Sequence, residues 1–401
     1  MKNETYADVS VGVRSRIFLP LRTTVVHILL QQKDKSMKDI VELLNGLIQN
    51  WHPALQIAMY VVGLALGVFC LVKFCDIFVD SSSAIAKKLK ISPLIIGLTI
   101  VAMGTSLPEL AVSVSDAIQC IAENQNANVA IGNVIGSNIC NILLVLGISV
   151  TFTPIAVRKN VSRREMPILL AATAIVVLFV GLFGLNSAAD INDLAITRWE
   201  GIILVVLMIA YMTYVIVMAK KHPEQIETEN DNEEVKSKEM PLWKAIILVI
   251  VGAVGIILGG QFVVFGAKGL ALKGASAMHL DADLAESIVG LTIVAVGTSL
   301  PELVTSAIAA KKGENEIALG NVIGSNLFNM LFVMGIAATV NPLTTGSQVL
   351  IDALVMLAAT ALLFVFALKG KLKRAHGISL LCIYVVYLTY LILRTVFGWS
   401  F

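Results

Sequence analysis

Long apolar stretches separated by short polar loops make up most of the chain after residue 50. Ten of these stretches reach or approach the ~20 residues that an α-helix needs to cross the hydrocarbon core of a bilayer. Their length and composition predict an all-α polytopic membrane protein with ten transmembrane helices. The predicted spans are 53–79, 93–120, 128–150, 166–185, 199–219, 243–272, 286–310, 316–339, 348–368 and 377–397.

One polar stretch divides the ten spans into two groups of five. It carries seven acidic residues and four lysines without ligand spacing, so we expect a short solvated linker, with a regulatory cation site as the alternative. The predicted organisation is a first five-helix repeat at 51–219, the linker at 220–242 and a second repeat at 243–401. Residues 1–50 are only moderately apolar and are expected to form an N-terminal extension of unclear structure.

Two phrases occur twice in the chain, once in each group of spans. Residues 97–110 read GLTIVAMGTSLPEL and residues 290–303 read GLTIVAVGTSLPEL, with a single difference. The second phrase reads AIGNVIGSNICN at 130–141 and ALGNVIGSNLFN at 318–329. Matching phrases in both groups predict that the two groups are structural repeats that meet near the middle of the membrane.

The number of spans in each group determines the relative orientation of the repeats. Five is odd, so the second group must enter the membrane from the opposite side, which predicts inverted-topology repeats. Loops after odd-numbered spans carry 18 Lys and Arg residues, and the remaining loops with the C-terminal tail carry 4. Because basic residues are retained on the cytoplasmic side, this bias predicts a cytoplasmic linker.

The first phrase combines a carboxylate, two hydroxyls and a proline on one helix. At 100° per residue, Thr105, Ser106 and Glu109 share a face, and Pro108 lacks the N–H that would bond the Gly104 carbonyl. A carbonyl freed inside a membrane needs another partner, such as water or a cation. Thr298, Ser299 and Glu302 repeat this arrangement in the second copy.

The second phrase provides neutral oxygen ligands. Asn133, Ser137 and Asn141 are spaced at i, i+4 and i+8, with Asn138 at the edge of their face, and Asn321, Ser325, Asn326 and Asn329 repeat the pattern. Its GxxxG spacing also suits helix packing, which is the structural alternative for a single copy. Two carboxylates with hydroxyl, amide and carbonyl oxygens, and no basic residue in the central parts of these helices, favour Na⁺ or Ca²⁺.

Composition narrows the function further. A chain with 57% hydrophobic and 14% charged residues and a mean hydropathy of +0.84 is typical of membrane proteins, and its net charge of +2 adds nothing. The five cysteines form no CxxC pair and are expected to be buried free thiols, with disulfides or a thiolate metal site as alternatives. The sequence lacks a Walker-type phosphate loop, which argues against an ATP-driven pump. We therefore expect neither an enzyme nor a cofactor or nucleic-acid partner.

GTSLPE at 104–109 and 297–302, with GNVIGSN at 132–138 and 320–326, resembles the α-repeats of the calcium/cation antiporter superfamily, which includes the Na⁺/Ca²⁺ exchangers. The motifs look most similar to the prokaryotic branch and to the K⁺-dependent exchangers. The resemblance implies a ten-helix inverted repeat in a prokaryotic inner membrane, with ions bound between spans 2, 3, 7 and 8. It also implies that spans 1 and 6 slide across the other helices to alternate access.

The same resemblance implies a role for each candidate ligand. Glu109 and Glu302 would be shared central ligands, Asn141 and Asn329 would complete the centre, and carbonyls near Ala102 and Ala295 would contribute. The hydroxyl ligands would be Thr105, Ser106, Thr298 and Ser299, and the flanking Na⁺ positions would be lined by Ser137, Asn138, Ser325 and Asn326.

One position departs from the family pattern. Many members have an aspartate where this chain has Asn329, so the centre holds two carboxylates and the stoichiometry and K⁺ dependence stay open. The expected function is Ca²⁺ extrusion driven by the Na⁺ gradient, with Ca²⁺ and Na⁺ as substrates. The alternatives are a Ca²⁺/H⁺ or other cation/H⁺ antiporter on the same scaffold, or a membrane scaffold or ion sensor that transports nothing. The sequence does not indicate an oligomeric state.

Overall fold

A computed structural model describes residues 40–122, 129–183, 194–221, 240–277, 295–345 and 348–397. The chain divides into two compact units, Met1–Asn50 and Trp51–Phe401. In the first unit the described part contains helix α2 (Ile40–Ile48). Residues 1–39 of the predicted extension, 222–239 of the linker and 286–294 of the predicted seventh span lie outside the described residues.

The second unit is predominantly helical, as the apolar pattern predicted. Among the described residues, eight helices are long and apolar enough to cross a membrane, or nine if a bent pair counts as one span. The bent pair is Pro93–Thr105 with Leu107–Ile121, which meet at 47°. This bend confirms that the helix carrying the first phrase is interrupted beside Pro108.

The elements of the chain up to the linker keep the order of the predicted spans. After α3 (Pro53–Leu89), the interrupted second span comprises four segments, of which η1 is π-helical. The remaining elements contain three further π-helical segments, η2, η3 and η4. In order, the elements after α3 are α4 (Pro93–Ile96), η1 (Gly97–Val101), α5 (Ala102–Thr105), α6 (Leu107–Ala122), α7 (Val129–Cys140), η2 (Asn141–Val145), α8 (Leu146–Phe152), β1 (Ile155–Ala156), η3 (Val161–Glu165), α9 (Met166–Leu178), η4 (Phe179–Phe183), β2 (Leu194–Ile196) and α11 (Arg198–Lys221).

The elements after the linker follow a similar order, although in the described chain α18 lacks the π-helical segments that flank α9. The segment η6 is π-helical, like η2, and the described part of the predicted seventh span is α14 with α15. In order, the elements are α12 (Leu242–Ala277), α14 (Ala295–Thr298), α15 (Leu300–Lys311), α16 (Asn315–Leu327), η6 (Phe328–Val333), α17 (Met334–Val340), β3 (Leu343–Thr345), α18 (Gln348–Ala367), β4 (Lys371–Leu372) and α19 (Arg374–Phe397).

Two helices are longer than predicted. The span expected at 53–79 continues to Leu89 as a helix of 37 residues, and the span expected at 243–272 becomes a helix of 36 residues. The apolar run ends near Val79, but Ser81, Ser82 and Ser83 are buried and the helix continues until Lys90, which has a left-handed φ of 54°. Lys87 and Lys88, expected in a loop, therefore lie in the last turn of α3.

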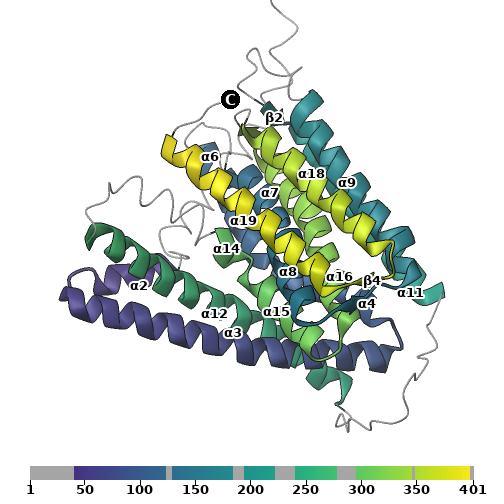
Figure 1. The fold of residues 1–401 in the computed structure, drawn as a ribbon, viewed down its shortest axis with the longest axis horizontal. Helices are drawn as coiled ribbons and strands as arrows, with labels where there is room; N and C mark the ends of the chain where they lie inside the picture. Colours follow the sequence, from purple (N-terminus) through teal and green to yellow (C-terminus); the bar gives the residue numbers. More distant parts are fainter. Residues whose placement is uncertain are drawn as a thin grey trace, which may run out of the picture. The chain divides into compact units, whose positions relative to one another are not determined.

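Helices α3 and α12 form a closely packed pair that lies across the upright helices of the second unit (Figure 1). Their backbones approach each other closely at several glycines, of which Gly67 and Gly259 are examples. A Cβ added at Gly67 would lie 2.6 Å from the Val263 nitrogen, and one at Gly259 would lie 2.9 Å from the Leu71 nitrogen. A larger side chain at either position would therefore force the two helices apart.

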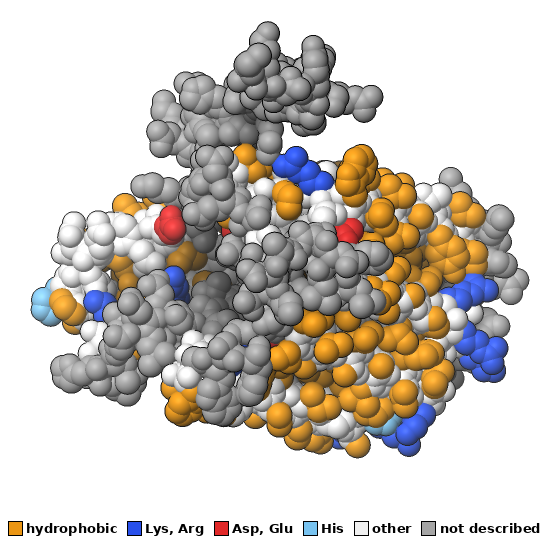
Figure 2. Space-filling model, turned by 90° about the horizontal axis from the view of Figure 1, so that it is seen from above, with side chains coloured by type: hydrophobic (Ala, Val, Ile, Leu, Met, Phe, Trp, Pro, Cys, Tyr) orange, Lys and Arg blue, Asp and Glu red, His pale blue; other side chains and the backbone are white. Residues whose placement is uncertain are grey.

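The helices that carry the second phrase form the interior of the unit. In their most apolar stretches 78% and 83% of the residues are buried, compared with 11% in α19. The exposed large hydrophobic side chains lie mainly on α3, α11, α12 and α19. Hydrophobic side chains cover much of the face seen in Figure 2. This distribution, with an apolar outside and the polar phrases inside, is that of an integral membrane protein.

Two short antiparallel ladders join the part before the linker to the part after it. Strand β1 pairs with β4 through Ile155 and Leu372, and β2 pairs with β3 through Ala195 and Thr344. Strands β1 and β3 follow α8 and α17, the last helical segments of the spans that carry the second phrase, and β2 and β4 precede the long helices α11 and α19. The two ladders are therefore equivalent. In each, the strand that follows the second-phrase span of one half pairs with the strand that precedes the last long helix of the other half.

Candidate cation-binding site

The two glutamates lie in the first turn of a helix that begins after a break. Ser106 ends the first segment with φ −86° and ψ 9°, and α6 starts at Leu107. Ser299 has nearly the same conformation, with φ −89° and ψ 4°, before α15 starts at Leu300. The proline follows at the second helical position in both copies, where a missing N–H costs no helical bond, so the expectation that Pro108 itself frees the Gly104 carbonyl was wrong. Glu109 and Glu302 are the next residues.

Each break packs against the second phrase of the other half. Helix α5 contacts α16, and α14 contacts α7. The contacts at the first break include Thr105 Oγ1 to Asn321 Oδ1 at 3.1 Å and Thr105 Oγ1 to Ser325 Oγ at 3.3 Å. The two copies of the second phrase also contact each other, with Asn329 Nδ2 3.2 Å from Ser137 Oγ. These contacts bring predicted ligands from both halves of the chain together.

The two carboxylates are fully buried and differ in their partners. Glu302 Oε1 accepts a hydrogen bond from Ser106 Oγ at 3.0 Å, whereas Glu302 Oε2 and both oxygens of Glu109 have no hydrogen-bond partner in the described part of the chain. Glu302 acts electrostatically on Glu109, and no ion pair between described residues involves either carboxylate. Two uncompensated carboxylates therefore share one buried region.

The neighbouring amides also have unused polar atoms. Both side-chain polar atoms of Asn138, Asn141 and Asn326 are buried without a partner among the described residues, as is Asn329 Oδ1. Buried polar groups are usually hydrogen-bonded, because an unsatisfied group costs about 1–3 kcal/mol. Most of the unpartnered buried polar atoms in the described chain belong to seven predicted site residues. These residues are Glu109, Asn138, Asn141, Ser299, Glu302, Asn326 and Asn329.

Asn141 and Asn329 lie at matching π-helical turns. The Leu146 N–H bonds the Asn141 carbonyl, and the Met334 N–H bonds the Asn329 carbonyl, five residues back in each case. Such turns are uncommon and occur frequently at functional sites. The 100° spacing used to place residues on helix faces no longer holds beyond Asn141, so side-chain positions there could not be predicted from a regular helix.

The fourteen predicted ligand residues are mostly buried in the structure. Twelve are buried, Thr298 is half-buried, and the side chain of Ala295 is outside the described part. The Ala102 carbonyl accepts a hydrogen bond from Ser106 N at 3.1 Å and lies 3.3 Å from Thr105 Oγ1, whose single proton has a nearer acceptor in Asn321 Oδ1 at 3.1 Å. The second lone pair of this carbonyl is therefore available to a cation.

Asn133 and Asn321 have a role that the sequence pattern did not reveal. Asn133 Nδ2 donates to Ser113 Oγ at 3.0 Å, and Asn321 Nδ2 donates to Ser306 Oγ at 2.9 Å. The two amides thus contact the glutamate-bearing helices and leave the ion-ligand face to Ser137 and Asn141. A serine four residues after each glutamate is the signal that could have indicated this pairing.

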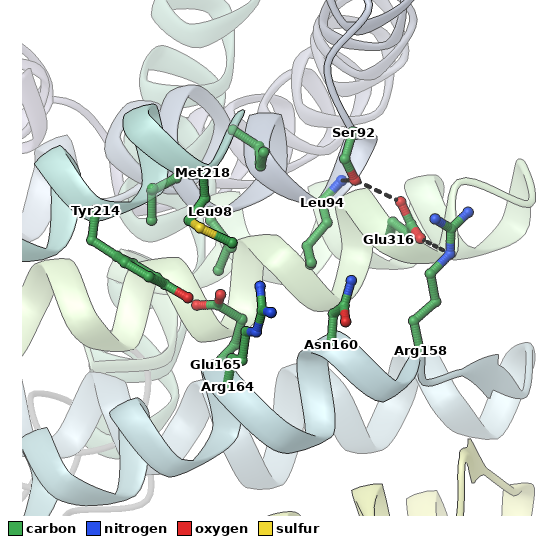
Figure 3. A pocket seen from close by; sticks show the side chains of 12 residues that line it. Ser92, Leu94, Leu98, Arg158, Asn160, Arg164, Glu165, Tyr214, Met218 and Glu316 are labelled. Carbon is green, nitrogen blue, oxygen red and sulfur yellow. Dashed lines mark hydrogen bonds and ion pairs between the residues drawn. The ribbon is translucent and has the colours of Figure 1, made fainter. Parts of the chain in front are cut away.

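A separate cavity of about 330 Å³ lies away from the predicted ligands (Figure 3). Ser92 donates to Glu316 Oε2 at 3.1 Å, and Arg158 pairs with the same carboxylate. Arg164 and Tyr214 line another part of its wall. Its lining contains none of the fourteen predicted ligands, and its charged residues occur as oppositely charged neighbours.

The ligand set of the candidate site consists of two carboxylates and neutral oxygens. Among the described residues there is no group of three or more His, Cys, Asp or Glu side chains that could hold a metal ion. Carboxylate, amide and hydroxyl oxygens are hard ligands that bind Ca²⁺ and Na⁺ well. The fold and this cluster together define a polytopic helical membrane protein with buried oxygen atoms of the type that hard cations prefer.

Comparison with known proteins identifies the family. The family profile described as "Sodium/calcium exchanger protein" matches residues 59–217 and 244–393. The putative antiporter CaxA of Alkalimonas amylolytica is 36% identical over 78% of this chain and 92% of its own length. The sodium/calcium exchanger MaX1 of Methanosarcina acetivorans is 32% identical over 82% of this chain and 97% of its own length. The chain belongs to the sodium/calcium exchanger family, so the resemblance carried by the doubled motif is confirmed.

Solved structures agree with this assignment. The sodium-calcium exchanger NCX_Mj, soaked with zero Na⁺ and Ca²⁺, matches with a TM-score of 0.67 and 30% sequence identity. The match covers 84% of this chain and 99% of that chain. The shared fold extends over nearly the whole of the related transporter, and the chain is therefore an antiporter of this family.

Proposed function

We propose that the protein is a secondary antiporter that expels Ca²⁺ in exchange for Na⁺ entering down its gradient. The observation that carries the proposal is the cluster of fully buried, unpartnered oxygens around Glu109 and Glu302. Two carboxylates balance the charge of one dehydrated Ca²⁺, or of two Na⁺ ions. A site that can neutralise either load, but has too little charge for both, exchanges one for the other.

The proposed scaffold is a ten-helix inverted repeat. Two observations support it: the matching conformations of Ser106 and Ser299 and the equivalent ladders β1–β4 and β2–β3. In this arrangement 51–219 and 243–401 are the two repeats, and 220–242 is a cytoplasmic linker. The basic-residue bias and the prokaryotic relatives favour a prokaryotic inner membrane.

The proposed ligands are the residues predicted from the doubled motif. Glu109 and Glu302 are the shared central ligands, with Asn141 and Asn329 beside them, and hydroxyls and amides of the two phrases complete the flanking positions. The α3–α12 pair would move across these helices to open the site alternately to each side. The close approach of the two helices at Gly67 and Gly259 supports movement of the pair as one body.

A Ca²⁺/H⁺ antiporter is the second candidate. The observation that favours it is the complete burial of Glu109 without any hydrogen-bond partner in the described chain. A buried carboxylate can be neutralised by a proton as well as by a metal cation. The many neutral oxygens favour Na⁺, because a proton needs one acceptor whereas Na⁺ needs several.

Ca²⁺ uptake into proteoliposomes distinguishes the two candidates. Vesicles loaded with Na⁺ and diluted into Na⁺-free medium should accumulate Ca²⁺, and the uptake should survive a protonophore and disappear when the Na⁺ gradient is removed. Uptake that is abolished by the protonophore and does not depend on Na⁺ would contradict Na⁺ exchange. Repeating the assay with and without K⁺ shows whether a K⁺ ion accompanies Ca²⁺.

A further inference from the structure

We propose that Asn133 and Asn321 are positioning residues that hold the two glutamate-bearing turns in the geometry that binds the cation, with Asn321 having the larger effect. This inference deepens the proposed function and rests on it. Neither residue is among the fourteen proposed ligands. Each acts through backbone and serine contacts with the helix that carries a proposed ligand.

The same contacts occur in both halves of the chain. Asn133 Nδ2 lies 3.0 Å from Ser113 Oγ and 3.4 Å from the Glu109 carbonyl oxygen. Asn321 Nδ2 lies 2.9 Å from Ser306 Oγ and 3.5 Å from the Glu302 carbonyl oxygen. In each case the side-chain amide of the second-phrase helix donates to the backbone carbonyl oxygen of the glutamate itself. Two copies of one arrangement argue against an accidental packing contact.

The position of the glutamate in its helix explains why such a contact matters. Glu109 and Glu302 are third in helices that start at a break, so the helical bonding pattern before each turn is interrupted and restricts its orientation less than a continuous helix would. Ca²⁺–oxygen distances fall within about 2.3–2.6 Å, so a shift on the order of half an ångström changes coordination. A donor on the neighbouring helix that bonds the glutamate carbonyl limits this shift.

Asn321 makes one more contact than Asn133. Its Oδ1 accepts the Thr105 hydroxyl at 3.1 Å, so its side chain connects a proposed ligand of the first half to the Glu302 turn of the second half. Asn321 is fully buried, whereas Asn133 is half-buried. Loss of Asn321 therefore disturbs ligands on both halves. Loss of Asn133 releases only the Glu109 turn.

The test compares apparent Ca²⁺ affinity and maximal rate in proteoliposomes. Asn321→Leu removes the donor and the acceptor at similar volume, and Ser306→Ala removes the acceptor that the amide uses. We expect the KM for Ca²⁺ to rise about tenfold in Asn321→Leu, the size of effect typical of residues that orient metal ligands. Asn133→Leu should raise the KM about threefold, and the maximal rate should fall less than the affinity in each variant.

Two matched controls separate positioning from stability. Thr173 and Thr360 are buried threonines that bond the carbonyls of Leu169 and Met356 at 2.8 Å, on helices without a proposed ligand. Thr173→Val and Thr360→Val should lower the thermal midpoint and leave the KM unchanged.

A double variant tests whether Asn321 and Ser306 act through one hydrogen bond. Since both Asn321→Leu and Ser306→Ala break the same bond, their combination should raise the KM no more than Asn321→Leu alone.

The inference is overturned if Asn321→Leu and Ser306→Ala lower the thermal midpoint while their KM for Ca²⁺ stays within twofold of wild type. Ser306→Ala removes a single oxygen, so it decides the question if Asn321→Leu does not fold. The wild-type counter-ion is measured first with the same vesicles. Wild-type exchange of Ca²⁺ for H⁺ would refute the Na⁺ proposal alone, because the KM for Ca²⁺ can be compared among variants with either counter-ion.

Discussion

Buried acidic residues occur in two kinds of surroundings within the second unit. Asp352 on α18 bonds Arg394 at 3.2 Å and the Tyr387 hydroxyl at 3.2 Å. Glu109 and Glu302, by contrast, have no basic partner among the described residues and retain three unpartnered carboxylate oxygens. Both kinds of carboxylate are buried, with Asp352 8% exposed and the two glutamates 0%, so low exposure alone does not explain their different surroundings.

The difference teaches how to separate an architectural charge from a functional one in this protein. Asp352 is neutralised within the protein and connects α18 to α19, so its charge is complete without any ligand. The two glutamates are surrounded by amide and hydroxyl oxygens, which cannot neutralise them. Leaving charge uncompensated at such depth costs several kcal/mol. That cost is reasonable where a transported cation supplies the missing charge.

Removing one charge from the uncompensated pair should have the largest effect. Glu109→Gln and Glu302→Gln each keep the side-chain volume and remove half of the negative charge that is proposed to balance Ca²⁺. We expect at least a hundredfold loss of Ca²⁺ flux in each variant, measured in proteoliposomes with an imposed Na⁺ gradient. The amount of folded protein is checked in parallel by size-exclusion chromatography. Near-normal flux in both variants would refute the proposed site.

Removing one charge from the compensated pair should affect stability and leave exchange intact. Arg394→Met leaves Asp352 buried without its cation, and breaking such a pair costs about 3 kcal/mol. We expect a lower thermal midpoint, with flux per folded protein within twofold of wild type. Adding Asp352→Leu to this variant removes both charges and should recover much of the stability. A large loss of flux in the double variant would mean that this pair belongs to the transport mechanism.

An ion pair near the surface should matter least. Lys312, which follows α15, lies 2.7 Å from the exposed Asp80 and 3.1 Å from the half-buried Asp76, both on α3. Because the pair is partly hydrated, Lys312→Gln should cost no more than about 1 kcal/mol. A thermal-stability scan at neutral pH measures this loss, and Lys311→Gln in the last turn of α15 is the neighbouring control. A loss as large as that of Arg394→Met would contradict this ranking.

The pH dependence of the same pair follows from its pKa. Burial disfavours the charged amine, but hydrogen bonds and attraction from Asp80 and Asp76 outweigh it, so the Lys312 pKa is raised. A raised lysine pKa adds stability that is complete below the ordinary value near 10.5 and is lost only as pH rises through the folded-state value. The difference between wild type and Lys312→Gln should therefore be constant at neutral pH and shrink in strong alkali.

The sequence predicted the helices, the helix break and the two glutamates, because each of these features depends on residues that are close together in the chain. Apolar runs located the helices, Pro108 indicated the interruption, and the repeated motif singled out both glutamates. The length of α3 was missed, since buried serines extend it beyond its apolar run. The pairing of Asp352 with Arg394 was also missed, because the two residues lie on different helices and no spacing rule connects them.

Side-chain partners across helices were the least predictable part of the site. A helical wheel placed Asn133 with Ser137 and Asn141, but Asn133 is half-buried and its amide contacts Ser113 on α6. The choice between two neighbouring faces depends on which helix packs there, and one sequence contains no record of that packing. The equivalent contact of Asn321 with Ser306 likewise depends on the packing of α16 against α15.

Direct cation binding to the purified protein is the most decisive measurement. Wild-type protein in detergent should bind radioactive Ca²⁺ saturably, Na⁺ should displace it, and the double variant with Glu109→Gln and Glu302→Gln should bind none above background. The Arg394→Met variant, if folded, should bind like wild type. Saturable, Na⁺-sensitive Ca²⁺ binding that persists in the double glutamine variant would contradict the assignment of the two uncompensated carboxylates as the cation site.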